Sequence, residues 1–446
     1  MTIRNTMSRD LTRAADLGRA LPLAVGAALM TAAPAAAQLV TPFPIPAPPP
    51  ASAGVAPITI ADGLTLKPLA DLRIRYENVH QDGIAKDADA VTARLRPGVE
   101  LATRSGFSAL VEAEGTLPID PDYNSSTNGR TAYAGVSDPR NVELNRAQVQ
   151  YRSKAVTITA GRQLIALDDQ RFVGPAAWRQ NEQTFDAVRV EAKAIGPFFA
   201  DVAYSWSDRT IYGITADKLP ATSTVKQAIG GDNVFAGAGV KLGPLTAKGF
   251  AYLVDQDAPG RQIFSSQTYG IRASAKVPAG PLTVNLLGSY ARQSDYSSNP
   301  THYAASYWIV EGSTSVRGVG ATVGYEVLGA DGGGANTSFQ TPLASLHKFN
   351  GYADKFTVTP ADGLTDLYAT VAYTLPGFRL LPGLAAGVTY HRFDSDRSTR
   401  RYGDEWDPQV SFRLHTVGVL VKYATYTADT FATDTRKFWI ELDWTT

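Results

Sequence analysis

Residues 71–77 read DLRIRYE, and residues 91–101 read VTARLRPGVEL. In both stretches apolar side chains alternate with charged or polar ones, as Leu72 and Ile74 do around Arg73. Successive side chains of a β-strand point to opposite faces of the sheet. Each stretch therefore predicts a strand with one apolar and one polar face.

The same period of two recurs along the chain, for example at residues 146–152, 188–194 and 200–206. Beyond residue 60 no apolar stretch approaches the roughly 20 residues that a membrane-spanning helix needs. The final segment, 437–444, places Phe438, Ile440, Leu442 and Trp444 on one face, as expected of the last strand of an outer-membrane barrel.

The connections between the expected strands fall into two classes that alternate along the chain. The short ones are 104–106, 153–154, 196–197, 243–244, 278–281, 312–315, 376–382 and 413–415. The long, polar ones are 78–90, 119–141, 166–183, 210–231, 256–266, 293–302, 328–363, 395–403 and 427–433. They separate about 18 strands.

This pattern predicts an all-β fold, a single transmembrane antiparallel β-barrel with short periplasmic turns and long extracellular loops. No strand edge can stay unpaired in a membrane, so the sheet must close. A soluble sandwich or propeller is the alternative, and it would turn the apolar faces inward.

The N-terminal region predicts export. Four Arg residues precede an apolar stretch at 20–30, and small residues follow at 35–37, the order of a secretory signal peptide. We expect residues 1–37 to be removed after Ala37, residues 38–63 to be a Pro-rich leader, and residues 64–446 to form the barrel. The expected location is the outer membrane of a Gram-negative bacterium.

Composition excludes several classes of protein. The 446 residues include 42 Lys+Arg, 42 Asp+Glu and no Cys. A net charge of zero argues against a nucleic-acid partner, which requires a basic excess. Without Cys there is no disulfide, thiolate metal site or cysteine nucleophile. The five His form no metal motif or triad spacing, so neither a metal, a cofactor nor an enzyme activity is expected.

Arg is frequent on the expected inner faces of the strands. A barrel of about 16–18 strands is wide enough for an aqueous channel, and rings of Arg favour anions. By strand parity the inward set is Arg73, Arg75, Arg94, Arg96, Arg146, Arg152, Arg189 and Arg272, with Arg162 near a strand end. The alternative is that these Arg residues pair with Glu residues across strands and only hold the wall together.

Two loops are too rich in specific side chains to be simple spacers. Residues 161–186 read GRQLIALDDQRFVGPAAWRQNEQTFD, and residues 341–356 read TPLASLHKFNGYADKF. Long loops are usually functional, and aromatic rings beside polar groups suit a sugar. In the second loop the candidate residues are His347, Lys348, Asn350, Tyr352, Asp354 and Lys355. A self-packed cap is the alternative.

The same two segments, together with KYATYTAD and KFWIELD between Lys422 and Asp443, resemble motif blocks of the alginate export family. The resemblance covers roughly residues 64–446. It implies an 18-stranded outer-membrane barrel that passes an acidic polysaccharide, not alginate in particular, through an Arg-rich, anion-selective constriction. By motif position it implies a pore-mouth set of Arg162, Asp168, Arg171, Arg179 and Asp186.

The sequence therefore predicts a passive outer-membrane channel for an anionic polysaccharide or oligosaccharide such as a polyuronate. The expected partners are membrane lipid, this saccharide and periplasmic export components. The alternatives are a nutrient-uptake porin for small anionic or sugar solutes, an outer-membrane hydrolase, and a barrel with a plugged lumen.

Overall fold

A computed structural model describes residues 55–280, 282–375, 378 and 380–445. The expected signal peptide, residues 1–37, and most of the Pro-rich leader lie outside the described residues. Within them the chain is almost entirely strand, with three short 3-10 helices at Gly213–Lys218, Gln262–Phe264 and Leu346–Lys348. No described helix is long and apolar enough to cross a membrane.

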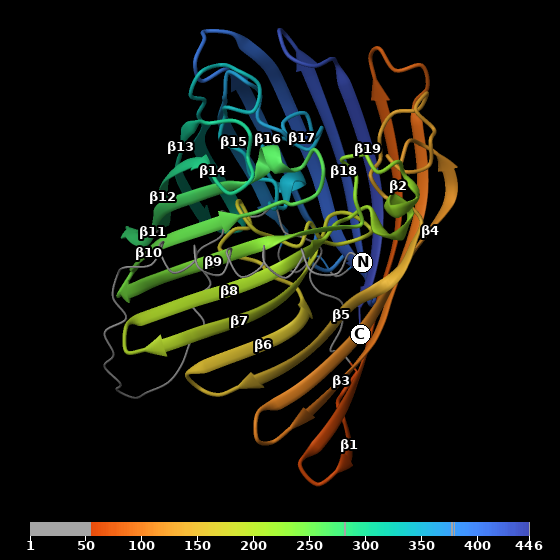
Figure 1. Cartoon of the computed structure of the whole chain (residues 1–446), viewed down its shortest axis with the longest axis vertical. Helices are drawn as coiled ribbons and strands as arrows, with labels where there is room; N and C mark the ends of the chain where they lie inside the picture. The colour runs from red at the N-terminus through yellow and green to blue at the C-terminus, as the bar shows by residue number, and fades with distance from the viewer. Residues whose placement is uncertain (1–54, 281, 376–377, 379, 446) are drawn as a thin grey trace, which may run out of the picture.

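Nineteen strands follow one another along the described chain (Figure 1). They are β1 Ile58–Ala61, β2 Leu64–Gln81, β3 Ala88–Thr103, β4 Phe107–Asp122, β5 Asn141–Arg152, β6 Val156–Gln163, β7 Thr184–Ile195, β8 Phe198–Arg209, β9 Ala228–Leu242, β10 Leu245–Val254, β11 Ser266–Ala279, β12 Leu282–Asp295, β13 Ala304–Val316, β14 Val319–Leu328, β15 Leu364–Thr374, β16 Ala385–Asp394, β17 Arg401–Leu414, β18 Val417–Ala428 and β19 Thr435–Thr445.

Eighteen of these strands, β2 to β19, form a closed antiparallel ring. Each pairs with its neighbours in the chain, and β19 pairs with β2 from Gln81↔Thr435 to Asp71↔Thr445. Closure satisfies the backbone groups that an open edge would leave unpaired in lipid. The expected 18-stranded barrel is confirmed. β1, at the end of the leader, adds a short hairpin to the start of β2.

The apolar faces of the strands point outward. Leu72, Ile74, Leu95 and Val99 are exposed, whereas Arg75 beside them is 1% exposed. A soluble sandwich would show the reverse, so this alternative is wrong. An apolar exterior around a polar interior is the arrangement of a membrane barrel.

Outward aromatic side chains gather near both ends of the strands. On the short-turn side these include Phe107, Tyr151, Phe198 and Tyr373, and on the long-loop side Tyr204, Trp206, Tyr269, Trp308 and Trp406. Amphipathic rings favour the two membrane–water interfaces. The two belts therefore mark the boundaries of the bilayer.

A charge on the outer wall between these belts is expected to destabilise the barrel. Val310 lies mid-strand in β13 and is 61% exposed. Val310→Arg is expected to lower the free energy of unfolding by about 2–4 kcal/mol, because Arg is costly at the bilayer midplane. Urea titration of the barrel in lipid vesicles measures this. Val310→Leu is the control, and an equal effect of both substitutions would place Val310 outside the bilayer.

One expected turn is misplaced. Residues 312–315 do not form a turn, because β13 continues to Val316 and the chain reverses at Arg317 and Gly318. Both have positive φ values, 48° and 86°. Gly312 suggests a turn by its residue type, yet it pairs with Leu286 within the sheet. A Cβ at Gly312 would meet only Leu286 Cδ2 at 3.8 Å, so this glycine lies in an ordinary strand position and its residue type was a misleading turn signal.

Candidate functional site

Two long loops fold into the ring of strands (Figure 1). The β6–β7 loop comprises residues 164–183 and the β14–β15 loop residues 329–363. They are joined through the backbone: Gly174 N–H donates to the Leu343 carbonyl at 2.9 Å, and Ser345 N–H to the Gln170 carbonyl at 3.1 Å. The two loops therefore form one body.

A buried apolar core stabilises this body. Phe172 of the β6–β7 loop packs against Phe339 of the β14–β15 loop and Tyr307 of β13, with ring centroids 5.9 and 5.2 Å apart. Burial of large apolar side chains contributes about 1.5–3 kcal/mol each. The loops are thus packed like part of a protein interior.

Arg171 attaches the body to the barrel wall. Its guanidinium is 2.6 Å from the Glu326 carboxylate on β14, and it also donates to Asn350 at 3.0 Å and Thr341 at 3.2 Å. Arg171 is 1% exposed. Asn350 in turn donates to Glu326 at 2.8 Å. Removing one member of such a buried network leaves charged groups unpaired, which is strongly destabilising.

Adjacent carboxylates attach the other side of the β6–β7 loop. Asp168 accepts from Lys248 of β10 at 2.9 Å, and Asp169 accepts from Arg272 of β11 at 2.7 Å. The charges of Arg272 and Lys348 outweigh burial and lower the pKa of Asp169. Both acids are thus structural ion-pair partners.

The β14–β15 loop is held against β17 by its own backbone. Ala353 N–H donates to Glu405 at 2.6 Å, and Tyr352 N–H donates to Asp407 at 3.1 Å. Gly351 has φ 84°, and a Cβ there would lie 2.4 Å from the Glu405 carboxylate. Another residue would be strained by this φ and would displace the Glu405 carboxylate that accepts from Ala353.

A cavity of about 830 Å³ passes beside the two loops. On the long-loop side it is lined by residues such as Gln81 and Lys226, and on the short-turn side by Gly418 and Thr445. These positions lie near opposite ends of the barrel strands. The cavity therefore extends along the lumen past the loops, with Trp178 of the β6–β7 loop among its lining.

Cations outnumber carboxylates in this cavity. Its lining includes eight Lys and Arg side chains, namely Arg73, Arg179, Lys226, Arg261, Lys348, Lys355, Lys422 and Lys437. It includes five carboxylates, namely Asp71, Asp208, Asp354, Glu441 and Asp443. Only three of the eight cations (Arg73, Arg179 and Lys437) form an ion pair with a residue that the structure describes.

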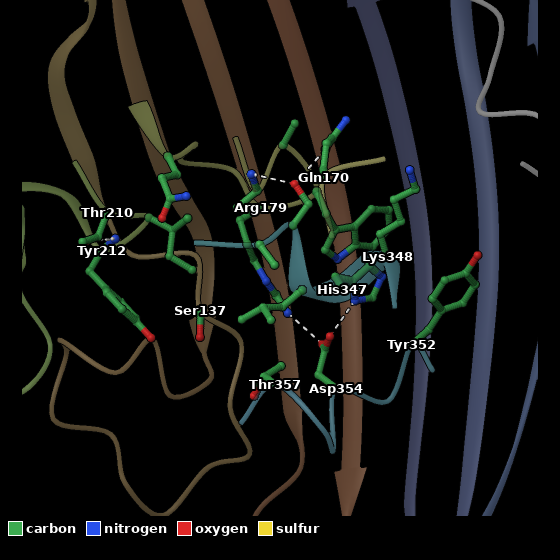
Figure 2. A pocket seen from close by; sticks show the side chains of 18 of the residues that line it. Ser137, Gln170, Arg179, Thr210, Tyr212, His347, Lys348, Tyr352, Asp354 and Thr357 are labelled. Atoms are coloured by element: carbon green, nitrogen blue, oxygen red, sulfur yellow. Dashed lines mark hydrogen bonds and ion pairs between the residues drawn. The ribbon is translucent and has the colours of Figure 1, made fainter. Parts of the chain in front are cut away.

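Aromatic rings stack at the centre of the cavity wall. His347 lies parallel to Trp178 with ring centroids 4.3 Å apart, and it stacks on Tyr352 at 5.2 Å. Lys422 Nζ lies 3.1 Å from the centroid of the Tyr352 ring. Figure 2 shows His347 and Arg179 converging on Asp354 at the edge of this stack. Both faces of His347 are covered by these contacts, and Arg75 lies 4.0 Å from the Trp178 ring centroid. The stack therefore meets a solute chiefly through the neighbouring cations, which suit the acidic group of a uronate.

Hydrogen-bond geometry indicates a neutral His347. Its Nδ1 is 2.8 Å from Asp354, and its Nε2 is 2.9 Å from Lys422 Nζ, so Nε2 accepts while Nδ1–H donates. Burial lowers the pKa of His347 well below its ordinary value, and Lys422 adds to this against the pull of Asp354. Burial would raise the pKa of Asp354, but His347, Lys437 and Arg179 beside it hold that pKa well below its usual range.

The closed loops are therefore expected to loosen in mild acid. A released His347 would have an ordinary pKa of about 6.5, so below that pH the released state binds a proton that the packed state does not. Packing is then weakened by up to about 1.4 kcal/mol per pH unit. Asp354 has a lowered pKa, so it stays ionised and continues to stabilise the packed loops between pH 7 and pH 5. Single-channel conductance is expected to become noisier and larger from pH 7 to pH 5.

His347→Gln is the control for this pH effect, because glutamine keeps hydrogen-bonding groups but does not titrate. It is expected to remove the pH dependence. The same dependence in wild type and His347→Gln would assign the effect to other groups.

The structure places the predicted site residues in several different settings. Those that line the cavity are Arg73, Arg179, His347, Lys348, Tyr352, Asp354 and Lys355. Others form ion pairs: Arg75 with Glu441, Arg94 with Asp71, Arg96 with Glu114, Arg146 with Glu112, Arg162 with Asp186 and Arg189 with Asp201. Arg152 is exposed at the short-turn end of β5. Asn350 supports the loops.

Pairing across strands thus accounts for most of the inward Arg residues, as the alternative reading of the sequence proposed. Two cations that the sequence analysis did not single out, Lys422 and Lys437, line the cavity instead. Strand parity could have found them, since Lys437 alternates with Phe438 on the last strand. Lys226 and Arg261 come from loops, where parity gives no signal.

Comparisons with known proteins agree with this fold. The model of a family described as alginate export matches residues 66–205, which contain the first motif block and end before the other two. The resemblance inferred from the sequence is confirmed over these residues. No curated protein matches the chain.

Solved structures resemble nearly the whole barrel. OccAB1 of Acinetobacter baumannii is 14% identical, with a TM-score of 0.64, and the match covers 85% of this chain and 96% of that one. OpdO of Pseudomonas aeruginosa is 16% identical, with a TM-score of 0.62, covering 85% and 97%. OpdK of the same organism, crystallised with vanillate, is 12% identical, with a TM-score of 0.63, covering 85% and 98%.

OpdK is described as an outer membrane protein. At sequence identities of 12–16%, the similarity to these solved structures shows a shared fold. The chain thus has the fold of an outer-membrane β-barrel and resembles the alginate export family through its first strands.

Proposed function

We propose that the protein is a passive outer-membrane channel for anionic saccharides, with uronate oligosaccharides or a polyuronate chain as its substrate. The cavity beside the two loops carries this proposal, because it combines a cationic excess with stacked aromatic rings. Conduction requires binding that is strong enough to admit a solute and weak enough to release it. Partly exposed cations, screened by water, meet this condition.

The cations that act on the solute are those of the cavity rather than the paired Arg residues of the wall. Lys355 contributes a charge with no ion-pair partner among the described residues, and it lines the cavity beside Asp354. Burial lowers its pKa to about 8, so it is mostly protonated at neutral pH. A saccharide carboxylate would pass from such a cation to the next along the lining.

Uptake of small anionic solutes is the second candidate, and the size of the cavity favours it. About 830 Å³ lies within the range of sites that hold a single small ligand. A polymer would then occupy the cavity with only a short segment at a time. The vanillate in the OpdK structure is a small aromatic carboxylate, and it supports the same class of charge for solutes of this fold.

Block of ion current tests the function. The chain from residue 38 onward is refolded and inserted into a planar bilayer, and a uronate monosaccharide, a uronate trisaccharide, polyuronate and a neutral glucan are added in turn. Block by the uronates and not by the glucan is expected. Polyuronate block favours the polymer, and block by the monosaccharide alone favours small-solute uptake. Equal block by the neutral glucan would overturn the proposal.

A further inference from the structure

Asp208 is a buried carboxylate with one unsatisfied oxygen. It lies in β8, is 1% exposed and lines the cavity. Its Oδ1 has no hydrogen-bond partner, and it forms no ion pair with any residue that the structure describes. Buried polar atoms are nearly always satisfied by protein, water or a ligand, so this oxygen needs an explanation.

A β-bulge directs Asp208 into the lumen. In the pairing of β7 with β8, Asp186 lies opposite Ser207 and Ala187 opposite Ser205, so Trp206 is an extra residue on β8. A bulge shifts the alternation of side chains by one position. Asp208 then lies opposite Phe185, which is buried inside the barrel. Without the bulge, Asp208 would follow Trp206 to the lipid side.

Arg261 lines the same part of the cavity but does not bind Asp208. It donates through Nε to Gln256 at 3.0 Å, and its guanidinium lies 4.6 Å from the centroid of the Phe264 ring. Its remaining N–H groups have no partner among the described residues. Asp208 and Arg261 influence each other electrostatically, yet no ion pair joins them. The carboxylate and the guanidinium therefore both line the cavity without closing on each other.

Polar and aromatic groups complete this part of the lining. Thr210 and Tyr212 follow Asp208 in the chain and line the cavity as well. Figure 2 shows both across the cavity from Arg179 and Asp354. A sugar ring placed here could donate a hydroxyl hydrogen to Asp208, accept from Arg261 and lie against Tyr212.

We propose that Asp208, Arg261, Thr210 and Tyr212 form an outer saccharide subsite on the long-loop side of the aromatic stack. The inference rests on the proposed function and deepens it. A uronate trisaccharide would occupy this subsite with one unit, its hydroxyl bound to Asp208 and its carboxylate to Arg261. Its other units would reach the cations around the aromatic stack. A monosaccharide needs only those inner cations.

Two variants test the subsite in the planar bilayer. Asp208→Asn and Arg261→Gln are expected to raise the half-blocking concentration of the trisaccharide about tenfold, the usual effect of losing a hydrogen bond to a charged group. Block by the monosaccharide is expected to stay unchanged. The matched controls are Asp232→Asn and Arg292→Gln, because Asp232 pairs with the outward Tyr204 and Arg292 with Ser306 on the outer wall.

The outcomes separate this subsite from the function as a whole. If neither saccharide blocks the wild type, the proposed function fails. If the trisaccharide blocks wild type and both variants equally, the function stands and the subsite is overturned, because Asp208 is then satisfied by water alone. Arg261 is in a loop, so Arg261→Gln remains informative even if Asp208→Asn fails to refold.

Discussion

Arg171→Met is expected to raise single-channel conductance several-fold. Arg171 joins the β6–β7 loop to Glu326 of the wall and to Asn350 of the β14–β15 loop. Methionine keeps much of the apolar stem but removes all of these bonds. Glu326 would be left buried without its cation, at a cost of about 3–5 kcal/mol.

The unpaired Glu326 destabilises the packed state of the loops. The closed ring of strands is not affected in this way, because its backbone hydrogen bonds remain. The loops are therefore expected to leave the lumen for part of the time, and the open pore of an 18-stranded barrel is wide. Conductance in a planar bilayer and protease cleavage within residues 164–183 measure the release.

Arg152→Met is the matched control for this experiment, because Arg152 is exposed and forms no ion pair with any residue described in the structure. It is expected to leave conductance and cleavage unchanged. If Arg171→Met also leaves both unchanged, the loops are held by their apolar core alone and the ion pair has no part in closing the pore.

Lys355→Glu is expected to lower the anion-to-cation permeability ratio roughly tenfold. The substitution changes the charge beside the passing ion by two units, and each unit is worth about 1 kcal/mol at 4 Å even in water. Lys355 forms no ion pair with a described residue, so its field is not cancelled nearby. Reversal potential in a salt gradient measures the ratio.

The wild-type ratio is also expected to fall as the pH rises through about 8, where burial places the pKa of Lys355. Lys218→Glu, an equal charge change on an exposed extracellular residue outside the cavity lining, is expected to have little effect. Similar shifts from both variants would mean that selectivity follows the general charge of the surface, and that the cavity cations do not set it.

The barrel could be predicted from the sequence because its determinant is local. The alternation of side chains in stretches such as 71–77 predicts which of them share a face of the sheet. The regular succession of short and long connections predicts that consecutive strands are antiparallel neighbours. The membrane requires closure. What failed was a detail of the same kind: Gly312 suggested a turn within β13, because residue type alone does not separate a chain reversal from a glycine inside a strand.

The site was less predictable because its determinants are distant in sequence. The alternation of side chains correctly predicted that Arg75 points inward. It could not show that the carboxylate of Glu441, 366 residues away in sequence, lies 2.8 Å from Arg75 Nε where β19 pairs with β2. Such partners decide whether an Arg faces a solute or holds the wall. Likewise, a single extra residue at Trp206 turns Asp208 inward, and a bulge has no reliable signal in sequence.

Loop cations form the third case. Motif resemblance identified His347 and Lys355, but the cavity also depends on Arg261, whose loop has no distinctive pattern. A loop residue's position relative to the lumen depends on how the whole loop packs. Side-chain alternation and motifs therefore predict the inward residues of the wall and some of the loop residues that line the cavity. The three-dimensional structure is needed to identify the other lining residues.

The reversal potential of the wild-type channel tests the central claim most directly. The refolded chain from residue 38 onward is placed in a planar bilayer under a tenfold KCl gradient at pH 7. The cationic excess around the two loops predicts a reversal potential of the sign for chloride selectivity, reduced in magnitude when a uronate trisaccharide is added. A potential of the sign for potassium selectivity would contradict the account, because the cavity cations would then not govern what passes.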